Sequence, residues 1–179
     1  MEEAPILVER REGYRVITLN RPRYLNAFTE TMHQHLKRVL AETEDDGNCR
    51  ALLLTGAGRA FCTGQDLHER VDKDGKAVVL GGALDAYYNP LVRKLRALPF
   101  PVVAAVNGVA AGAGANIALA CDIVLAARSA SFIQAFAKIG SFPIAAAPGC
   151  CRGSSVPPAR AASRSPPSRL PPRRRKRGD

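Results

Sequence analysis

The sequence predicts an α/β fold in which most strands pair in parallel. Short segments rich in β-forming residues alternate along the chain with segments whose apolar residues recur at helical spacing. Some of the strand segments are continuous apolar runs, which are typical of buried strands in a parallel sheet. This alternation favours ββα or βαβ units over an all-α or an all-β fold.

The elements are expected in a definite order. A hairpin comes first, with strands at 6–9 and 14–19 joined by a turn at 11–13. A helix should begin after Thr29, a good N-cap residue. The later elements are a buried strand at 50–55, a helix at 81–98 that Pro99 and Pro101 end, a strand at 101–106, a helix at 110–120 and a buried strand at 122–126.

Composition excludes several classes of protein. A hydrophobic content of 46% is enough for a folded core, but no apolar run approaches the roughly 20 residues of a membrane span. The acidic start of the chain is not followed by the apolar stretch of a secretory signal. The five cysteines lack metal-type spacing, which predicts a reducing, cytoplasmic setting without disulfides. No metal site is expected, and His33 and His35 are interpreted as surface residues.

The formal charge of +10 is concentrated at the C-terminal end. Residues 141–179 hold 9 of the 26 basic residues, 1 of the 16 acidic residues and 8 of the 13 prolines. Such a segment cannot bury a core, so it is expected to be disordered. The chain is therefore divided into a folded core at 1–140 and a basic tail, rich in Pro, Arg and Ser, at 141–179. The nearly neutral core predicts no nucleic-acid partner.

Three glycine-containing segments, at 20–27, 58–67 and 105–116, border predicted strands. Glycine lets the backbone approach a ligand closely. Two backbone N–H groups in a dry site can hold the enolate oxygen of a thioester, and the start of a helix favours negative charge. For each segment alone, close packing of the backbone explains the glycines as well as ligand binding does. Gly112-Ala113-Gly114 also resembles the start of the Gly-x-Gly-x-x-Gly motif that binds dinucleotides. However, Ile117 stands where that motif requires a third glycine or an alanine.

Taken together, in this order and spacing, the three segments resemble the enoyl-CoA hydratase/isomerase (crotonase) superfamily. The resemblance covers about 6–140 and rests on the blocks Asn20-Arg21-Pro22…Asn26-Ala27, Phe61-Cys62-x-Gly64-x-Asp66-Leu67 and Ala105-Val106-Asn107-Gly108…Cys121-Asp122. It implies a spiral of ββα turns, here incomplete at the C-terminus. It also implies an acyl-CoA thioester substrate with no separate cofactor, and trimers or hexamers for the full family domain.

The resemblance further implies which residues form the site. The backbone N–H groups of Gln65 and Ala113 would form the oxyanion hole. The residues expected to border the coenzyme A moiety and the thioester are Arg23, Leu25, Ala27, Gly64, Gln65, Asp66, Leu67, His68, Gly112 and Ala113. Arg23 could meet a phosphate or be an ordinary solvated arginine. Asp66 is interpreted as a helix cap rather than a base.

Several other residues have mainly structural interpretations. His68 is expected to line the pocket. Tyr87 and Tyr88 are expected in core packing, with the border of the acyl pocket as the alternative. Cys62 and Cys121 are interpreted as small buried residues, and Asp122 as a structural cap or ion-pair partner.

The segments after Gly108 resemble the ring-1,2-epoxyphenylacetyl-CoA isomerase branch of the family. Family hydratases carry glutamates where this chain has Asn116 and Phe136, and neither of these can act as a general acid–base. In the isomerase branch the acid–base is an aspartate in a Pro-Asp-x-Gly-Gly block after a Lys-x-Gly motif. Here Lys138-Ile139-Gly140 is followed by no such block, so the chain as written is expected to be inactive.

Residues 141–155 can be back-translated so that a neighbouring reading frame encodes the absent block. We therefore hypothesise a frameshift at or just after Gly140, with a genuine in-frame basic tail as the alternative. Three other functions stay open. They are a non-catalytic acyl-CoA-binding paralogue, an enoyl-CoA hydratase of fatty-acid oxidation, and a nucleic-acid-binding arm built on the basic run at 173–177.

Overall fold

The computed structural model describes residues 4–70 and 84–134, and it has the predicted α/β class. The strands are β1 (Ile6–Arg11), β2 (Tyr14–Leu19), β3 (Leu52–Gly56), β4 (Ala60–Cys62), β5 (Val102–Val106), β6 (Val109–Ala111), β7 (Ile123–Ala126) and β8 (Ser131–Ile133). The helices are α1 (Glu30–Glu44), α3 (Asn89–Ala97) and α4 (Ala113–Ala120), with 3₁₀ turns η1 (Pro22–Tyr24) and η2 (Leu67–Arg70) and a π-helical turn η3 (Leu84–Tyr88).

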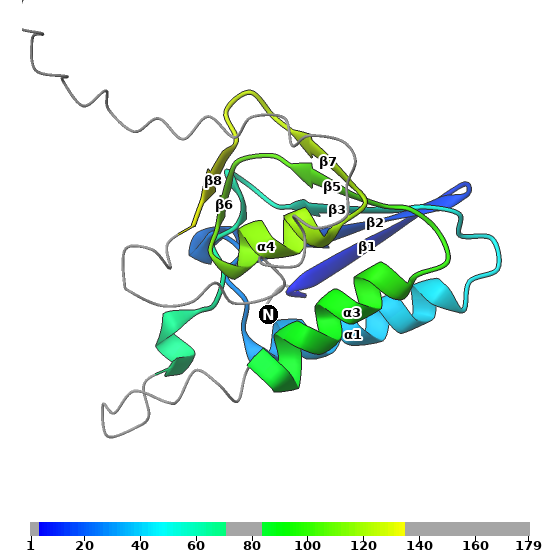
Figure 1. Ribbon diagram of the computed structural model, residues 1–179, viewed down its shortest axis with the longest axis horizontal. Helices are drawn as coiled ribbons and strands as arrows, with labels where there is room; N and C mark the ends of the chain where they lie inside the picture. The colour runs from blue at the N-terminus through cyan, green and yellow to red at the C-terminus, as the bar shows by residue number, and fades with distance from the viewer. Residues whose placement is uncertain (1–3, 71–83, 135–179) are drawn as a thin grey trace, which may run out of the picture.

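The strands form two sheets (Figure 1). The larger sheet has the order β1-β2-β3-β5-β7, and only the β1–β2 hairpin is antiparallel. The smaller sheet, β4-β6-β8, is parallel. The chain passes from β3 to β4, from β5 to β6 and from β7 to β8, so each turn contributes one strand to each sheet. Helices α3 and α4 lie between successive turns, which is the ββα spiral that the resemblance implied.

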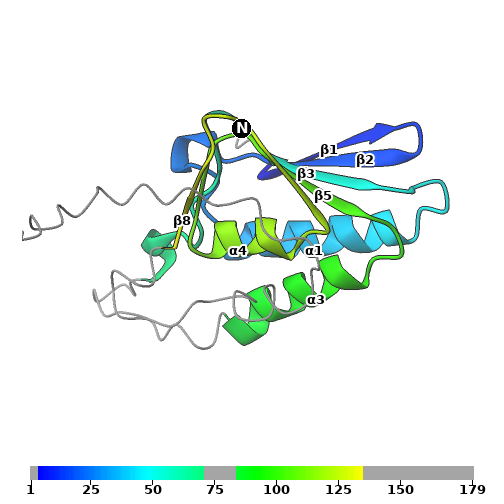
Figure 2. The ribbon, with the colours of Figure 1, turned by 45° about the horizontal axis from the view of Figure 1, so that its top comes forward.

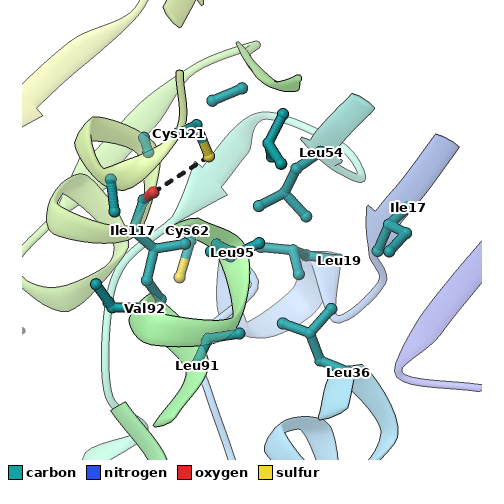
Figure 3. Packing of buried hydrophobic residues seen from close by; sticks show 14 of the residues in the cluster. Ile17, Leu19, Leu36, Leu54, Cys62, Leu91, Val92, Leu95, Ile117 and Cys121 are labelled. Atoms are coloured by element: carbon teal, nitrogen blue, oxygen red, sulfur yellow. Dashed lines mark hydrogen bonds between the residues drawn. The ribbon is translucent and has the colours of Figure 1, made fainter. Parts of the chain in front are cut away.

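The helices cover one face of the larger sheet (Figure 2). Residues of β3 and β5 alternate between buried and half-buried, so one face packs on the helices and the other is only partly covered. Leu54 of β3, Leu36 of α1 and Leu95 of α3 meet in the resulting core (Figure 3). The predicted cap of α1 is confirmed, because the Thr29 hydroxyl accepts a hydrogen bond from the Met32 N–H at 3.2 Å.

One prediction about the third segment was wrong, and the smaller sheet beside it was not predicted. The small-residue run predicted as a helix from 110 begins instead as strand β6, whose Ala110 pairs with β4 and β8. The helix starts only at Ala113, after Gly112 turns the chain with a φ of 52°. The small sheet was not foreseen, since β4 and β8 have three residues each and no readable period.

Strand β7 and His33 also differ from expectation. We expected β7 to be buried, but it lies at the edge of the larger sheet, with Ile123 and Leu125 exposed at 48% and 58%. His33 was placed on the surface, yet it is buried and stacks on Phe28 with ring centroids 4.6 Å apart. A histidine ring can join a core when aromatic neighbours cover its faces, and periodicity alone does not show this.

Some expectations fall outside the described residues. These are the first three residues of the helix predicted at 81–98, Phe136, the Lys-x-Gly motif and the tail at 141–179. Among the helices that are described, none has the length and apolar character needed to cross a membrane.

Candidate functional site

The first and second glycine-containing segments lie side by side. The Thr63 N–H donates to the Leu25 carbonyl at 3.2 Å. The Phe28 N–H donates to the Gly64 carbonyl at 2.7 Å, and the Asp66 N–H donates back to the Phe28 carbonyl at 2.9 Å. These bonds form a short parallel bridge between Phe28 and Gln65, which fixes the loop after β4 against the loop before α1.

The second and third segments touch at Gly64. Its φ of +94° is a conformation that favours glycine, and a Cβ atom there would lie 3.0 Å from the Ala111 carbonyl oxygen and 3.2 Å from the Ala113 nitrogen. Gly114 is closer still, since a Cβ would lie 2.3 Å from the Cys62 carbonyl oxygen. The end of β4 and the start of α4 therefore meet backbone to backbone, with no side chain between them.

The backbone N–H groups of Gln65 and Ala113 border this junction. Neither N–H donates a hydrogen bond to another group within the described residues. Ala113 is the first residue of α4, where N–H groups lack intrahelical acceptors and the helix dipole is positive. N–H groups of this kind hold an oxygen on which negative charge develops when two of them face the same point.

Asp66 has a structural role at this junction. One carboxylate oxygen accepts from the His68 N–H at 3.0 Å, so Asp66 caps η2 as predicted. The other accepts from Arg21 Nη1 at 2.9 Å, and the same nitrogen donates to the Ala27 carbonyl at 2.6 Å. The carboxylate is buried and committed to these partners, so its side chain holds the two loops together.

The remaining residues expected at the site are distributed between the surface and the interior. Arg23 on η1 is exposed, as are Leu67 (72%) and His68 on η2. Leu25 is half-buried and adopts a left-handed φ of 50°. Ala27 and Gly112 are buried.

Tyr88 is buried, as predicted, but sequence reasoning did not foresee the hydrogen bonds by which Asn26 and Tyr88 shape these loops. Asn26 is buried, and its amide donates to the carbonyls of Ala57 (2.9 Å) and Ala60 (2.8 Å). Tyr88 donates its hydroxyl proton to Gln65 Oε1 at 2.8 Å. The positive φ of Asn26 is typical of asparagine in a turn, so this residue could have been recognised from its place after the proline turn.

Acid–base and nucleophilic groups are scarce at the junction. Asn116 of α4 is buried, and its Oδ1 accepts from Gln134 Nε2 at 2.9 Å. Burial raises the pKa of the Cys62 thiol to about 12, so the thiol stays neutral and a poor nucleophile. The prediction that Cys62 and Cys121 are buried is confirmed, and Asp122 accepts from the Val102 N–H as a structural partner. The described residues hold no cluster of three or more side chains able to bind a metal.

Comparison with known proteins decides the family. A family model described as enoyl-CoA hydratase/isomerase matches residues 9–156. The chain belongs to the enoyl-CoA hydratase/isomerase family. The matched range ends 16 residues beyond the boundary at 140 that we predicted between core and tail.

Curated relatives and solved structures agree with this assignment. The chain is 55% identical over 139 residues to the 1,2-epoxyphenylacetyl-CoA isomerase of Escherichia coli, covering 77% of this chain and 53% of that protein. It is 49% identical over 132 residues to a "Probable enoyl-CoA hydratase" of Rhodobacter capsulatus, covering 74% and 49%. The crystal structure of an enoyl-CoA hydratase from Bacillus anthracis matches with a TM-score of 0.71 and 33% identity, covering 79% and 54%. The chain spans about half the length of the curated relatives it matches.

Proposed function

We propose that this chain carries the thioester-binding half of an acyl-CoA isomerase, with the N–H groups of Gln65 and Ala113 as the oxyanion hole. The observation that carries the proposal is the contact at Gly64, where an added Cβ would lie 3.2 Å from the Ala113 nitrogen. A thioester carbonyl at this junction would accept two hydrogen bonds. Both would strengthen as the oxygen becomes an enolate, which is how such donors lower a reaction barrier.

The coenzyme A moiety would lie along the loops that the first two segments form. Arg23 is exposed and available for a charge-assisted contact with a phosphate. Leu25, Ala27 and residues 64–68 would border the adenine and the pantetheine arm, and Gly112 would border the thioester. Coenzyme A is part of the substrate in this proposal, so no separate cofactor is needed.

The acyl group that we propose is ring-1,2-epoxyphenylacetyl, as part of cytoplasmic aromatic acid catabolism. The support is the 55% identity to the E. coli isomerase over 139 residues. Enoyl-CoA hydration is the alternative, and the 49% identity to the Rhodobacter protein supports it. Against hydration, Asn116 stands where family hydratases are expected to carry a carboxylate. The full family domain would assemble as a homotrimer or hexamer.

We further propose that this chain binds the thioester without turning it over. The amide of Asn116 cannot serve as a general acid or base at neutral pH, and the sequence contains no Pro-Asp-x-Gly-Gly block after Gly140. An acyl-CoA binder without catalysis would use the same two N–H groups. Isomerase or hydratase turnover by the purified chain would contradict this part of the proposal.

The test compares phenylacetyl-CoA with a thioether analogue of the same length that lacks the carbonyl. Calorimetry on the purified chain should show tighter binding of the thioester. Ala113→Pro removes one donor at the first helical position, where proline is tolerated, so it should abolish this preference. Ala113→Ser keeps the N–H and serves as the matched control. Equal affinities of the unmodified chain for the two ligands would overturn the proposed oxyanion hole.

A further inference from the structure

The side chain of Gln65 is bonded although the proposed oxyanion hole uses only its backbone. Its Oε1 accepts from the Tyr88 hydroxyl at 2.8 Å. Its Nε2 donates to the Phe28 carbonyl at 3.2 Å. Both ends of the amide are therefore held, one by the turn before α3 and one by the loop before α1.

The position of the Tyr88 hydroxyl is itself fixed by packing. Tyr88 is 1% exposed at the end of η3, directly before α3. Its ring packs edge-on against Phe28, with centroids 6.2 Å apart, and against His33, with centroids 4.6 Å apart. Packing that fixes the ring also fixes the position of the hydroxyl oxygen, so the phenol can anchor the group that accepts its proton.

The Phe28 carbonyl accepts hydrogen bonds from both the backbone and a side chain of the loop after β4. It accepts from the Asp66 N–H at 2.9 Å as well as from Gln65 Nε2. On the other side of Gln65, the Gly64 carbonyl accepts from the Phe28 N–H at 2.7 Å. The residues on either side of Gln65 therefore each form a backbone hydrogen bond with Phe28. The Gln65 side chain forms a third hydrogen bond with the same residue.

We propose that Tyr88 is a positioning residue that acts through the Gln65 side chain to aim the Gln65 N–H at the oxygen that Ala113 also meets. The inference rests on the proposed function, and it adds a link from helix α3 to the thioester site. Tyr88 and Gln65 are 23 positions apart, and their bond joins the turn before α3 to the loop after β4. Without that bond, Gln65 would keep its backbone bridge and the Nε2 bond to Phe28, but its side chain would lose one of its two anchors.

The test replaces Tyr88 by phenylalanine, which keeps the ring and removes the hydroxyl. Tyr14→Phe is the matched control, because Tyr14 is 42% exposed at the start of β2 and belongs to the hairpin. For each variant, the affinities for phenylacetyl-CoA and for its thioether analogue are measured. The amide resonance of Gln65 is followed in parallel by ¹⁵N–¹H spectroscopy without ligand.

In Tyr88→Phe the preference for the thioester should fall about two- to tenfold, the usual effect of one hydrogen bond, while thioether affinity stays the same. The Gln65 amide resonance should shift in this variant and not in Tyr14→Phe. An unchanged preference, or an equal loss of both affinities, would overturn the positioning role. If the unmodified chain shows no preference at all, the oxyanion hole itself fails. The proposed role of Tyr88 then fails with it, and a shifted Gln65 resonance in Tyr88→Phe would show only that the two side chains are bonded.

Discussion

The central strands of the larger sheet and the last described elements differ in how completely their apolar side chains are covered. In β2, β3 and β5, inward-facing residues such as Leu19, Leu54 and Val102 are at most 1% exposed. The last described elements are different. Leu119 of α4, Ile123 and Leu125 of β7, and Ile133 of β8 are between 41% and 58% exposed.

Burial in the molecule therefore differs between central and edge strands. Helices α1 and α3 pack on the central strands, whereas the edge strands β1 and β7 leave Leu7, Ile123 and Leu125 exposed. Exposed apolar side chains on an edge strand favour association with other chains. We expect stability to depend on the covered region and solubility to depend on the uncovered one.

The largest effect is expected from one substitution placed in each region. Leu54→Ala removes a side chain that is 1% exposed, so it should lower the free energy of unfolding by about 2–5 kcal/mol. Leu125→Ala changes a side chain that is 58% exposed and should cost less than about 0.5 kcal/mol. Urea unfolding followed by circular dichroism measures both. Equal costs would show that the contrast between the two regions is wrong.

A second comparison concerns the backbone contact between β4 and α4. Gly114→Ala would put a Cβ 2.3 Å from the Cys62 carbonyl oxygen, so the two backbones must separate, at a cost of about 1–3 kcal/mol. Gly47→Ala is the control, because a Cβ there meets nothing within 4 Å. Thermal unfolding should show a lower midpoint for Gly114→Ala alone. A normal midpoint would mean that the two backbones are farther apart than described.

Edge strand β7, with Ile123 and Leu125 exposed, should promote self-association. Leu125→Lys places a charge on β7, and charged side chains on edge strands oppose pairing between chains. Sedimentation velocity should therefore detect less association for this variant than for the unmodified chain. Thr31→Lys, at an exposed position of α1, adds the same charge elsewhere and should leave association unchanged. An equal decrease in both variants would indicate a general effect of charge.

The smallest effect should come from an ion pair in the covered region. Arg15 donates to the Asp46 carboxylate at 2.8 Å, and this hydrogen bond lowers the pKa of Asp46 below its ordinary 3.8. The charged carboxylate thus stabilises the folded state above that pH, and the contribution disappears as the pH falls through the lowered pKa.

Asp46→Asn should therefore unfold more easily than the unmodified chain at pH 7, and the difference should vanish in strong acid. Urea unfolding at a series of pH values measures this. Asp45→Asn is the control, since Asp45 forms no ion pair with any described residue. A difference between Asp46→Asn and the unmodified chain that does not depend on pH would contradict the role of the Asp46 charge.

Local patterns predicted much of the fold. The hairpin, the Thr29 cap and the strand after Pro101 each depend on a few neighbouring residues, and all three are confirmed. The boundary between β6 and α4 could not be predicted in this way. A run of alanine and glycine has no apolar period, and only the turn at Gly112 separates strand from helix.

The candidate site was predictable only in part. The family resemblance pointed to the three segments, and the structure brings them into contact. The bond between Tyr88 and Gln65 was not foreseen, because it depends on where η3 lies in space and not on any local motif. The burial of His33 likewise depends on aromatic residues from two separate elements.

We propose that Gln65 and Ala113 together hold the oxygen of a thioester. The most direct measurement is the ¹³C resonance of the carbonyl in phenylacetyl-CoA labelled at that carbon and bound to the purified chain. Two N–H donors polarise the carbonyl, so we predict a downfield shift on binding that Ala113→Pro reduces and Ala113→Ser preserves. A bound carbonyl with the resonance it has in water, or an equal shift in all three proteins, would contradict the claim.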